Sequence, residues 1–291
     1  MTDTSSIQKE FDQLGYVLDE ELATVLFLTL HLQKPLLLEG PPGVGKTEVA
    51  NVLAQALDTE LIRLQCYEGL DVNAAVYEWN YQKQLLSIKL QEGSQKSEAE
   101  KESHIFGEDF LLQRPLLRAI TATKKAPVLL IDEIDRADEE FEAFLLELLS
   151  AFQISIPEMG TIKATHKPLV ILTSNRTREL SDALKRRCLY HWVAYPDLPR
   201  ELRIVQKHLP QLDKQLSENL VRIVQVLRER KLNKVPGIAE TLDWVNALVA
   251  LQATNPTADD LARSLGCLLK SADDIEMVKA SGLEELLVVS E

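Results

Sequence analysis

Cysteine is scarce in this chain, and the way its three cysteines are placed excludes two classes of protein. Cys66, Cys188 and Cys267 are odd in number, lie far apart and form no CxxC pair. This spacing argues against a disulfide framework and against a zinc cluster. The five histidines are dispersed as well, and no pair has the spacing of helical metal ligands. We therefore assign no transition metal and expect a reducing, cytoplasmic environment.

Glycine, proline and long apolar runs are also limited. Among 291 residues there are 11 Gly and 12 Pro, and 45% of residues are hydrophobic and 26% charged, which excludes collagen-like, low-complexity and disordered chains. The longest apolar stretch, residues 22–32, is interrupted by polar residues and is shorter than the ~20 residues of a membrane span. The first residues lack the basic and apolar regions of a secretory signal. We expect no membrane span.

Basic residues are outnumbered by acidic ones. The chain has 32 Lys and Arg against 45 Asp and Glu, which gives a net charge of −13. A surface that binds a nucleic-acid backbone needs clustered Lys and Arg side chains. The charge balance therefore disfavours nucleic acid as a partner.

Short apolar runs alternate with helical patterns in the first two thirds of the chain. The runs predict strands, and the 3.6-residue periodicity between them predicts helices. Strands alternating with helices predict an α/β fold whose mainly parallel sheet is covered on both faces, with ligands at the carboxyl ends of the strands. The expected strands span residues 36–38, 61–64, 128–131 and 169–172, the expected helices 19–32, 46–57, 111–123, 141–149 and 178–185, and an expected hairpin 153–164.

Two further regions have a different character. Residues 65–109 predict an irregular insertion, whose later part, 91–109, is acidic and solvated. After a linker predicted at 195–199, apolar residues recur at helical spacing, and the only strand signal is a weak one at 286–289. We predict an α/β domain over residues 1–197 and a smaller all-α domain, the lid domain, over residues 198–291.

A phosphate-binding motif joins the first predicted strand to the helix that follows it. It matches G-x-x-x-x-G-K-[ST], a P-loop, in the strand–loop–helix context that the motif requires. Backbone N–H groups at a helix N-terminus bind phosphate oxygens, while the lysine reaches the β- and γ-phosphates and the hydroxyl ligates Mg²⁺. The motif consists of Gly40, Pro41, Pro42, Gly43, Val44, Gly45, Lys46 and Thr47.

Two later strands also end in polar residues. Asp132 and Glu133 follow the apolar run at 128–131, so Asp132 is expected to hold Mg²⁺ and Glu133 to activate the attacking water as a general base. Asn175 follows the next strand, where an amide can orient the water or contact the γ-phosphate, although a lone Asn there is commonly a turn residue. Arg186 and Arg187 are candidates to stabilise phosphoryl-transfer charge from a neighbouring subunit.

These motifs, in this order, resemble an AAA+ ATPase of the MoxR group. The resemblance covers about residues 15–250 and is closest to the carbon monoxide dehydrogenase accessory (CoxD-type) branch. It rests on the segments LLLEGPPGVGKTE, VLLIDEIDRAD, TSNRTRELSDALKRRCLY and PGIAETLDW.

The resemblance implies roles for several of these residues. It implies Walker A at 40–47, Walker B at Asp132 and Glu133, sensor 1 at Asn175, and an arginine finger at Arg187 with Arg186 as the adjacent candidate. It also implies a helix-2 insertion within about 65–109 and a pre-sensor-1 hairpin at about 153–164. Many relatives carry a sensor 2 arginine after a glycine of the lid; residues 236–241 contain none, and whether Lys234 replaces it stays open.

The leading hypothesis is a homo-oligomeric ring ATPase, a hexamer, that hydrolyses ATP with Mg²⁺ to remodel a protein client. By resemblance, its partner is a von Willebrand factor A domain protein and its client a maturing metalloenzyme of the molybdenum hydroxylase type. Two alternatives stay open: a nucleic-acid-remodelling AAA+ motor, and a nucleotide-bound scaffold that does not hydrolyse ATP. A signalling GTPase would need an Asn-Lys-x-Asp motif, and the only Asn-Lys pair, at residues 233–234, continues Val-Pro.

Overall fold

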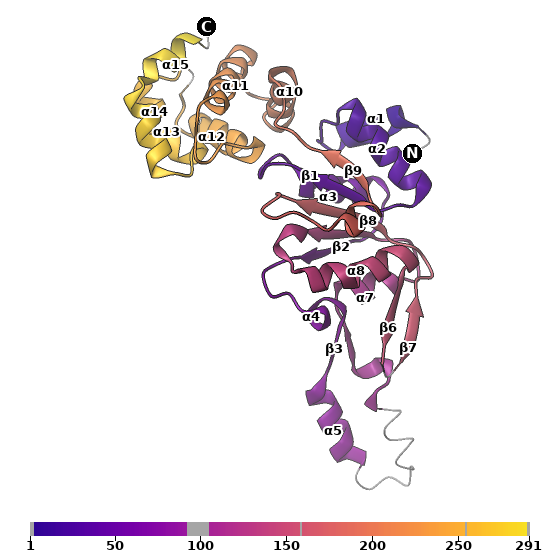
Figure 1. Ribbon diagram of the computed structural model, residues 1–291. Coiled ribbons are helices and arrows are strands. Elements are labelled where there is room, and N and C mark those ends of the chain that lie inside the picture. Colours follow the sequence, from indigo (N-terminus) through magenta and orange to yellow (C-terminus); the bar gives the residue numbers. More distant parts are fainter. Residues whose placement is uncertain (1–2, 92–104, 158, 254, 290–291) are drawn as a thin grey trace.

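A computed structural model describes residues 3–91, 105–157, 159–253 and 255–289. Its centre is a five-stranded parallel sheet, which confirms the predicted α/β class (Figure 1). The sheet contains, in spatial order, β2 (Leu61–Gln65), β5 (Val128–Asp132), β8 (Leu169–Ser174), β1 (Leu36–Glu39) and β9 (Leu189–Trp192).

Both faces of the sheet are buried, because alternate residues of each strand point to opposite sides. Leu36 and Leu38 pack in one hydrophobic core, and Leu37 between them packs in the other. The first core is covered by α1 (Thr4–Gln13), α2 (Glu20–Leu32) and α3 (Lys46–Ala56), and the second by α4 (Val72–Val76), α7 (Pro115–Ile120), α8 (Glu139–Ala151) and α9 (Asp182–Lys185).

The described residues of the segment 65–113 contain more regular structure than the predicted irregular insertion. They form α4, β3 (Tyr77–Trp79), α5 (Tyr81–Gln91), a short 3-10 turn η1 (Glu108–Phe110) and β4 (Leu111–Gln113). β3 and β4 pair antiparallel. Together with α5 they form an arm that projects away from the sheet, on the same side as the hairpin of β6 (Gln153–Ile156) and β7 (Gly160–Lys163) (Figure 1). Much of the acidic stretch predicted as solvated, residues 92–104, lies outside the described residues.

Six helices form the C-terminal region, at the opposite end from the arm (Figure 1). They enclose a third core around Trp244, whose indole N–H donates to Ser264 Oγ at 2.8 Å. The helices are α10 (Leu198–His208), α11 (Lys214–Glu229), α12 (Ile238–Ala250), α13 (Ala258–Leu268), α14 (Ala272–Ala280) and α15 (Leu283–Val289). No helix in the described ranges is long and apolar enough to cross a membrane.

The structure differs from the sequence predictions in the bounds of some elements and, at residues 286–289, in the type of element. The predicted helix 111–123 begins as β4, because Leu111–Gln113 pairs with β3, and α7 starts only at Pro115, a residue well suited to the first helical turn. Residues 286–289 are helical, because the third core buries Leu286 on one side of α15. The predicted helix 178–185 shortens to α9 behind its cap Ser181, and α10 begins inside the predicted linker.

Sequence reasoning missed several elements, among them α1 and β9. α1 is too polar for its two buried residues, Ile7 and Phe11, to form a clear stripe in the sequence. β9 alternates partly buried and exposed residues, since it is the edge strand and pairs only with β1 in the main sheet.

Because both faces of the sheet pack in a hydrophobic core, shortening a buried side chain of a strand should destabilise the protein. Replacing Leu130, which is fully buried, by Ala should lower the free energy of unfolding by about 2–5 kcal/mol through lost contacts and a cavity. Leu32→Ala, at a side chain that is 50% exposed, is the control and should change stability by about 0.5 kcal/mol or less. Urea unfolding followed by circular dichroism measures both; equal effects would contradict the assignment of Leu130 to the core.

Candidate functional site

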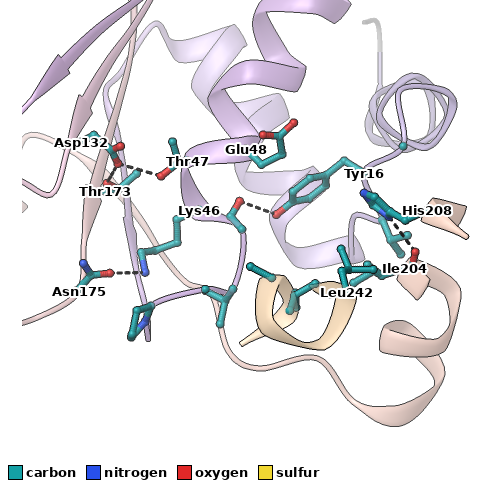
Figure 2. A pocket seen from close by; sticks show the side chains of 18 of the residues that line it. Tyr16, Lys46, Thr47, Glu48, Asp132, Thr173, Asn175, Ile204, His208 and Leu242 are labelled. Carbon is teal, nitrogen blue, oxygen red and sulfur yellow. Dashed lines mark hydrogen bonds between the residues drawn. The ribbon is translucent and has the colours of Figure 1, made fainter. Parts of the chain in front are cut away.

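A cavity of about 480 Å³ lies between the carboxyl edge of the sheet and the helical region. It is lined by residues from the loop after β1, from the ends of β5 and β8, and from α10 and α12 (Figure 2). The sheet order explains this convergence, because β5, β8 and β1 are parallel neighbours and end at one edge.

The loop at 40–47 adopts the conformation that a phosphate cradle requires. Gly43 and Gly45 have φ values of +75° and +88°, which residues with a Cβ rarely adopt. Gly45 is the N-cap of α3 and has no side chain to occupy the first N–H groups of the helix. These groups and the positive end of the helix dipole are free to meet an anion.

Lys46 lies folded against this loop. Its Nζ donates to the carbonyls of Gly40 and Pro41, both at 2.7 Å, and to Asn175 Oδ1 at 2.8 Å (Figure 2). Burial lowers the pKa of Lys46 to about 8, against the opposing effect of the carboxylates of Asp135, Asp132 and Glu133. The structure thus joins the loop to the residue after β8, as the sequence predicts for the ends of neighbouring strands.

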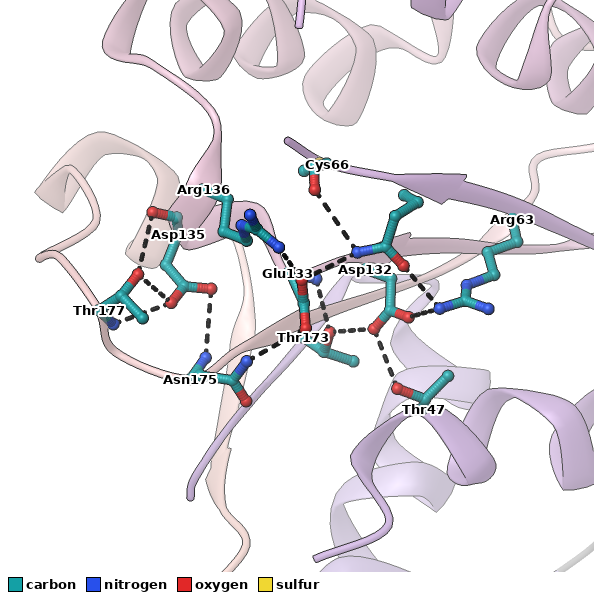
Figure 3. Close-up of polar contacts among 11 residues, drawn as sticks. Thr47, Arg63, Cys66, Asp132, Glu133, Asp135, Arg136, Thr173, Asn175 and Thr177 are labelled. Atoms are coloured by element: carbon teal, nitrogen blue, oxygen red, sulfur yellow. Dashed lines mark hydrogen bonds and ion pairs between the residues drawn. The ribbon is translucent and has the colours of Figure 1, made fainter. Parts of the chain in front are cut away.

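Asp132 is almost fully buried and is hydrogen-bonded on both carboxylate oxygens (Figure 3). Oδ1 accepts from Thr47 Oγ1 at 3.0 Å and from Thr173 Oγ1 at 2.5 Å. Oδ2 is paired with Arg63 of β2 at 2.5 Å. Sequence reasoning missed Arg63, because an arginine at an alternating strand position resembles any solvent-facing residue.

Glu133 turns the chain sharply after β5. Its φ of +54° is unusual for a residue with a Cβ, and its N–H is held by Thr173 Oγ1 at 2.9 Å. One carboxylate oxygen lies 3.4 Å from Asn175 Nδ2, and the other accepts from Gln65 at 3.1 Å and Arg136 at 3.2 Å (Figure 3). Glu133 therefore lines the cavity, and its contacts with Asn175, Gln65 and Arg136 orient its carboxylate.

Asp135 is a third carboxylate that the sequence interpretation passed over. It is buried and accepts hydrogen bonds from the backbone of Asn175 at 3.2 Å and from the backbone and hydroxyl of Thr177 at 2.8 and 2.7 Å. It therefore fastens the segment after β8 to the segment after β5. The sequence Asp-Glu-Ile-Asp offered a signal, since three acids in four residues after a buried strand need partners.

The outer part of the cavity is more apolar. Tyr16, Ile204 and Leu242 line it, and the Tyr16 hydroxyl donates to Gly45 O at 3.4 Å (Figure 2). Burial raises the pKa of Tyr16 above its ordinary value, so the phenol stays protonated as a donor. Arg200 of α10 also lines the cavity and is paired with Asp19 at 2.6 Å. The sequence alone did not indicate that the N-terminal segment and α10 would meet here.

The two predicted arginine candidates lie elsewhere. Arg186 and Arg187 are exposed, and neither is among the described residues that line the cavity. Arg187 Nε donates to Ser150 Oγ at 2.7 Å. Lys234, the other cation left open by the sequence, lies before α12, where its backbone N–H donates to Asp274 at 3.0 Å.

Comparison with known proteins places the chain in a family. Residues 35–188, more than half of the chain, match the model of the AAA domain (dynein-related subfamily). The chain belongs to this family. Its α/β P-loop AAA fold, with a five-stranded parallel sheet and a C-terminal helical region, is the predicted one. Nucleotide binding is the property that the AAA domain implies.

Relatives and solved structures extend the comparison. Uncharacterized proteins of Staphylococcus aureus strains bovine RF122 / ET3-1 and USA300 are each 30% identical to the AAA chain over 227 residues, covering 76% of it and 77% of the relative. The RuvB Holliday junction branch migration motor of Thermotoga maritima is 18% identical, with a TM-score of 0.46 over 85% of this chain and 67% of that one. A RuvB mutant from the same organism is 16% identical, with a TM-score of 0.49 over 91% and 70%.

The fastening role of Asp135 can be tested by stability. Asp135→Asn replaces an acceptor oxygen by an amide donor that faces N–H and O–H donors, and should lower the free energy of unfolding by about 1–3 kcal/mol. Asp243→Asn, on the exposed side of α12, is the matched control and should have little effect. Urea unfolding measures both variants, and equal midpoints would show that the three hydrogen bonds do not stabilise the fold.

Proposed function

We propose that this AAA protein binds ATP with Mg²⁺ and hydrolyses it in the cavity at the carboxyl edge of the sheet. One observation carries the proposal: Lys46, Thr47, Asp132, Glu133 and Asn175 come from three separate segments and converge on one cavity. Each has the chemical group that a step of phosphoryl transfer to water requires. Two units, residues 1–197 and 198–291, would enclose the nucleotide as core and lid.

Residues 40–47 are the phosphate-binding segment in this proposal. The N–H groups at the start of α3 would bind phosphate oxygens, and Lys46, which now donates to two carbonyls and Asn175, would turn to the β- and γ-phosphates. The charge on Lys46 is more strongly stabilised by phosphate than by carbonyl dipoles. The apolar outer part, with Tyr16 and Leu242, suits the base.

Thr47 and Asp132 fit a magnesium ion. A hydroxyl oxygen and a carboxylate oxygen 3.0 Å apart are hard donors of the kind that Mg²⁺ prefers. The ion would neutralise phosphate charge when bound. Arg63, paired with the other oxygen of Asp132, balances the negative charge of that buried carboxylate.

Glu133 and Asn175 are the proposed hydrolytic pair. Glu133 would accept the proton of the attacking water as general base, and Asn175 would orient the water or the γ-phosphate. The contacts of Glu133 with Gln65 and Arg136 support this, because they leave one carboxylate oxygen directed toward Asn175.

Arg187, with Arg186 beside it, is the proposed arginine finger. Both are exposed and absent from the lining of their own cavity, as expected of a residue that serves a neighbouring subunit. This supports a homo-oligomeric ring, a hexamer by the resemblance to MoxR proteins. A ring would place the cavity of one subunit against α9 of the next.

The most specific parts of the proposal are the MoxR group, its CoxD-type branch and the client. They rest on the segments TSNRTRELSDALKRRCLY and PGIAETLDW and agree with membership of the dynein-related AAA subfamily. In this reading ATP turnover moves the arm of β3, β4 and α5 and the β6–β7 hairpin against a metalloenzyme client, together with a von Willebrand factor A domain partner. The arm projects from the body, as a client-contacting element would (Figure 1).

The hydrolytic assignment is tested by separating binding from turnover. Glu133→Gln should bind Mg-ATP with wild-type affinity yet release phosphate about a hundredfold or more slowly, because the base is lost. Lys46→Met should raise the Kd for ATP about tenfold or more, because a charged contact to phosphate is lost. Titration with a fluorescent ATP analogue and a phosphate-release assay measure the two effects.

The control for both variants is Lys279→Met, an exposed lysine of α14 outside the cavity lining, which should keep binding and turnover. Phosphate release undiminished in Glu133→Gln would contradict its role as base. A wild-type protein that binds ATP without releasing phosphate would favour the nucleotide-bound scaffold instead.

The shared site is tested by mixing subunits. Arg187→Ala should bind ATP normally and hydrolyse it at least about a hundredfold more slowly, because charge stabilisation in the transition state is lost. Mixing it with Glu133→Gln should restore part of the turnover, since a site with an intact Glu133 can receive an intact Arg187 from its neighbour. Unmixed variants and Arg186→Ala are the controls. Full activity of Arg187→Ala would move the finger to Arg186 or exclude an intersubunit site.

A further inference from the structure

The lid approaches the phosphate loop backbone to backbone. The N–H of Ile238, the first residue of α12, donates to the carbonyl of Gly43 at 2.8 Å. A Cβ on Gly237 would lie 2.7 Å from Gly43 Cα and 2.8 Å from its carbonyl atoms, closer than real Cβ atoms come. The two backbone segments therefore lie so close together that only glycine fits at position 237.

A buried ion pair lies directly behind this contact. Both terminal N–H groups of Arg228 on α11 donate hydrogen bonds to the carboxylate of Glu201 on α10, each at 2.6 Å. The Arg228 side chain is 7% exposed and the Glu201 side chain 0%. Arg228 Nε donates to the carbonyl of Pro236 at 2.8 Å, and the guanidinium lies over the ring of Tyr195. Arg228 thus joins α10, α11 and the residue just before Gly237.

The first turn of α12 completes the attachment. Glu240 accepts from the N–H of Gly237 at 3.0 Å, and Thr241 donates to Glu201 at 2.9 Å and contacts the Gly237 carbonyl at 3.0 Å. Breaking this set would leave charged groups buried without partners, which is strongly unfavourable. The turn at 235–238 is therefore held in one position relative to the lid core.

The same turn borders the nucleotide cavity without bringing a positive charge to it. Ile238, Ala239 and Leu242 line the cavity, and the α12 sequence contains no Lys or Arg. α12 therefore brings no side-chain cation to bound phosphate, and it contacts the loop at 40–47 through the N–H of Ile238.

We infer that the turn at 235–238 positions the phosphate loop through the hydrogen bond from Ile238 N–H to Gly43 O, and that Arg228 is the positioning residue that holds this turn in place. The inference rests on the proposed nucleotide site. Gly43 is a glycine with a φ of +75°, so its backbone has wide conformational freedom, and the hydrogen bond from the lid restricts the orientation of its peptide group. Nucleotide affinity then depends on a contact that never touches the nucleotide.

The hydrogen bond can be removed with little change to the helix. Ile238→Pro deletes the N–H at the first helical position, where proline is favoured, and the extended backbone of Gly237 (φ −87°, ψ −172°) suits a residue before proline. Ile238→Ala is the matched control, because it also removes the side chain and keeps the N–H. With the full chain, Ile238→Pro should raise the Kd for Mg-ADP about fivefold relative to Ile238→Ala.

A second variant pair tests the close approach. Gly237→Ala places a methyl group against the Gly43 backbone and should weaken Mg-ADP binding at least as much as Ile238→Pro. Gly266→Ala, at a lid glycine with open space around its Cβ position, should leave affinity unchanged. Circular dichroism verifies that each variant is folded.

The role of Arg228 is tested by Arg228→Lys, which keeps the charge beside Glu201 but cannot make the two-pronged pair and the bond to Pro236 together. A positioning role predicts a raised KM for ATP with little change in kcat, and faster hydrogen–deuterium exchange of the peptide spanning 235–244. Exchange and KM equal to wild type would overturn the role of Arg228.

The outcomes separate this inference from the proposed function. Equal affinity and equal exchange at 235–244 in Ile238→Pro and Ile238→Ala overturn the inference, while wild-type nucleotide binding leaves the proposed function intact. Absence of nucleotide binding by the folded wild type overturns the proposed function. In that case the hydrogen bond from Ile238 N–H to Gly43 O is tested in the nucleotide-free protein. Faster exchange at 235–244 in Ile238→Pro than in Ile238→Ala supports its positioning role, and equal exchange overturns it.

Discussion

Parallel alignment of β1, β5 and β8 is the constraint on which the cavity depends. Because these neighbouring strands run in one direction, the chain leaves each of them at the same edge of the sheet. The loop before α3, the Asp132–Glu133 pair and Asn175 are thereby brought together although they are separated by up to 135 residues in the chain, from residue 40 to residue 175. Short hydrogen bonds among them then fix the side chains.

Charge balance within the cavity follows from that alignment. Lys46, Asp132 and Glu133 line the cavity and Asp135 lies close to it; because Lys46, Asp132 and Asp135 are buried, their charges need partners. Thr47, Thr173 and Arg63 satisfy Asp132, and backbone and hydroxyl groups after β8 satisfy Asp135. Glu133 is less buried and is directed by exposed neighbours. Asp132 is therefore held in an almost fully enclosed position, and Glu133 in a partly exposed one.

The helical region and the arm occupy opposite ends of the molecule (Figure 1). At the first end, the contact between Gly237 and Gly43 and the ion pair between Arg228 and Glu201 tie the lid to the cavity. At the other end, β3, β4 and α5 extend from the face covered by α4 and α7. The sheet between them is buried on both faces, and its carboxyl edge borders the cavity.

Several features were determined by the sequence alone, because they depend on local pattern. The apolar runs ending in Glu39, Asp132 and Ser174 predict buried parallel strands, and the motif at 40–47 predicts a loop between a strand and a helix. Only the tertiary structure decided the rest. Arg63 meets Asp132, Arg200 meets Asp19, and Gly237 meets Gly43 across long separations, and no local periodicity encodes such pairs. The residues of α15 likewise became helical because the third core could bury one side of them.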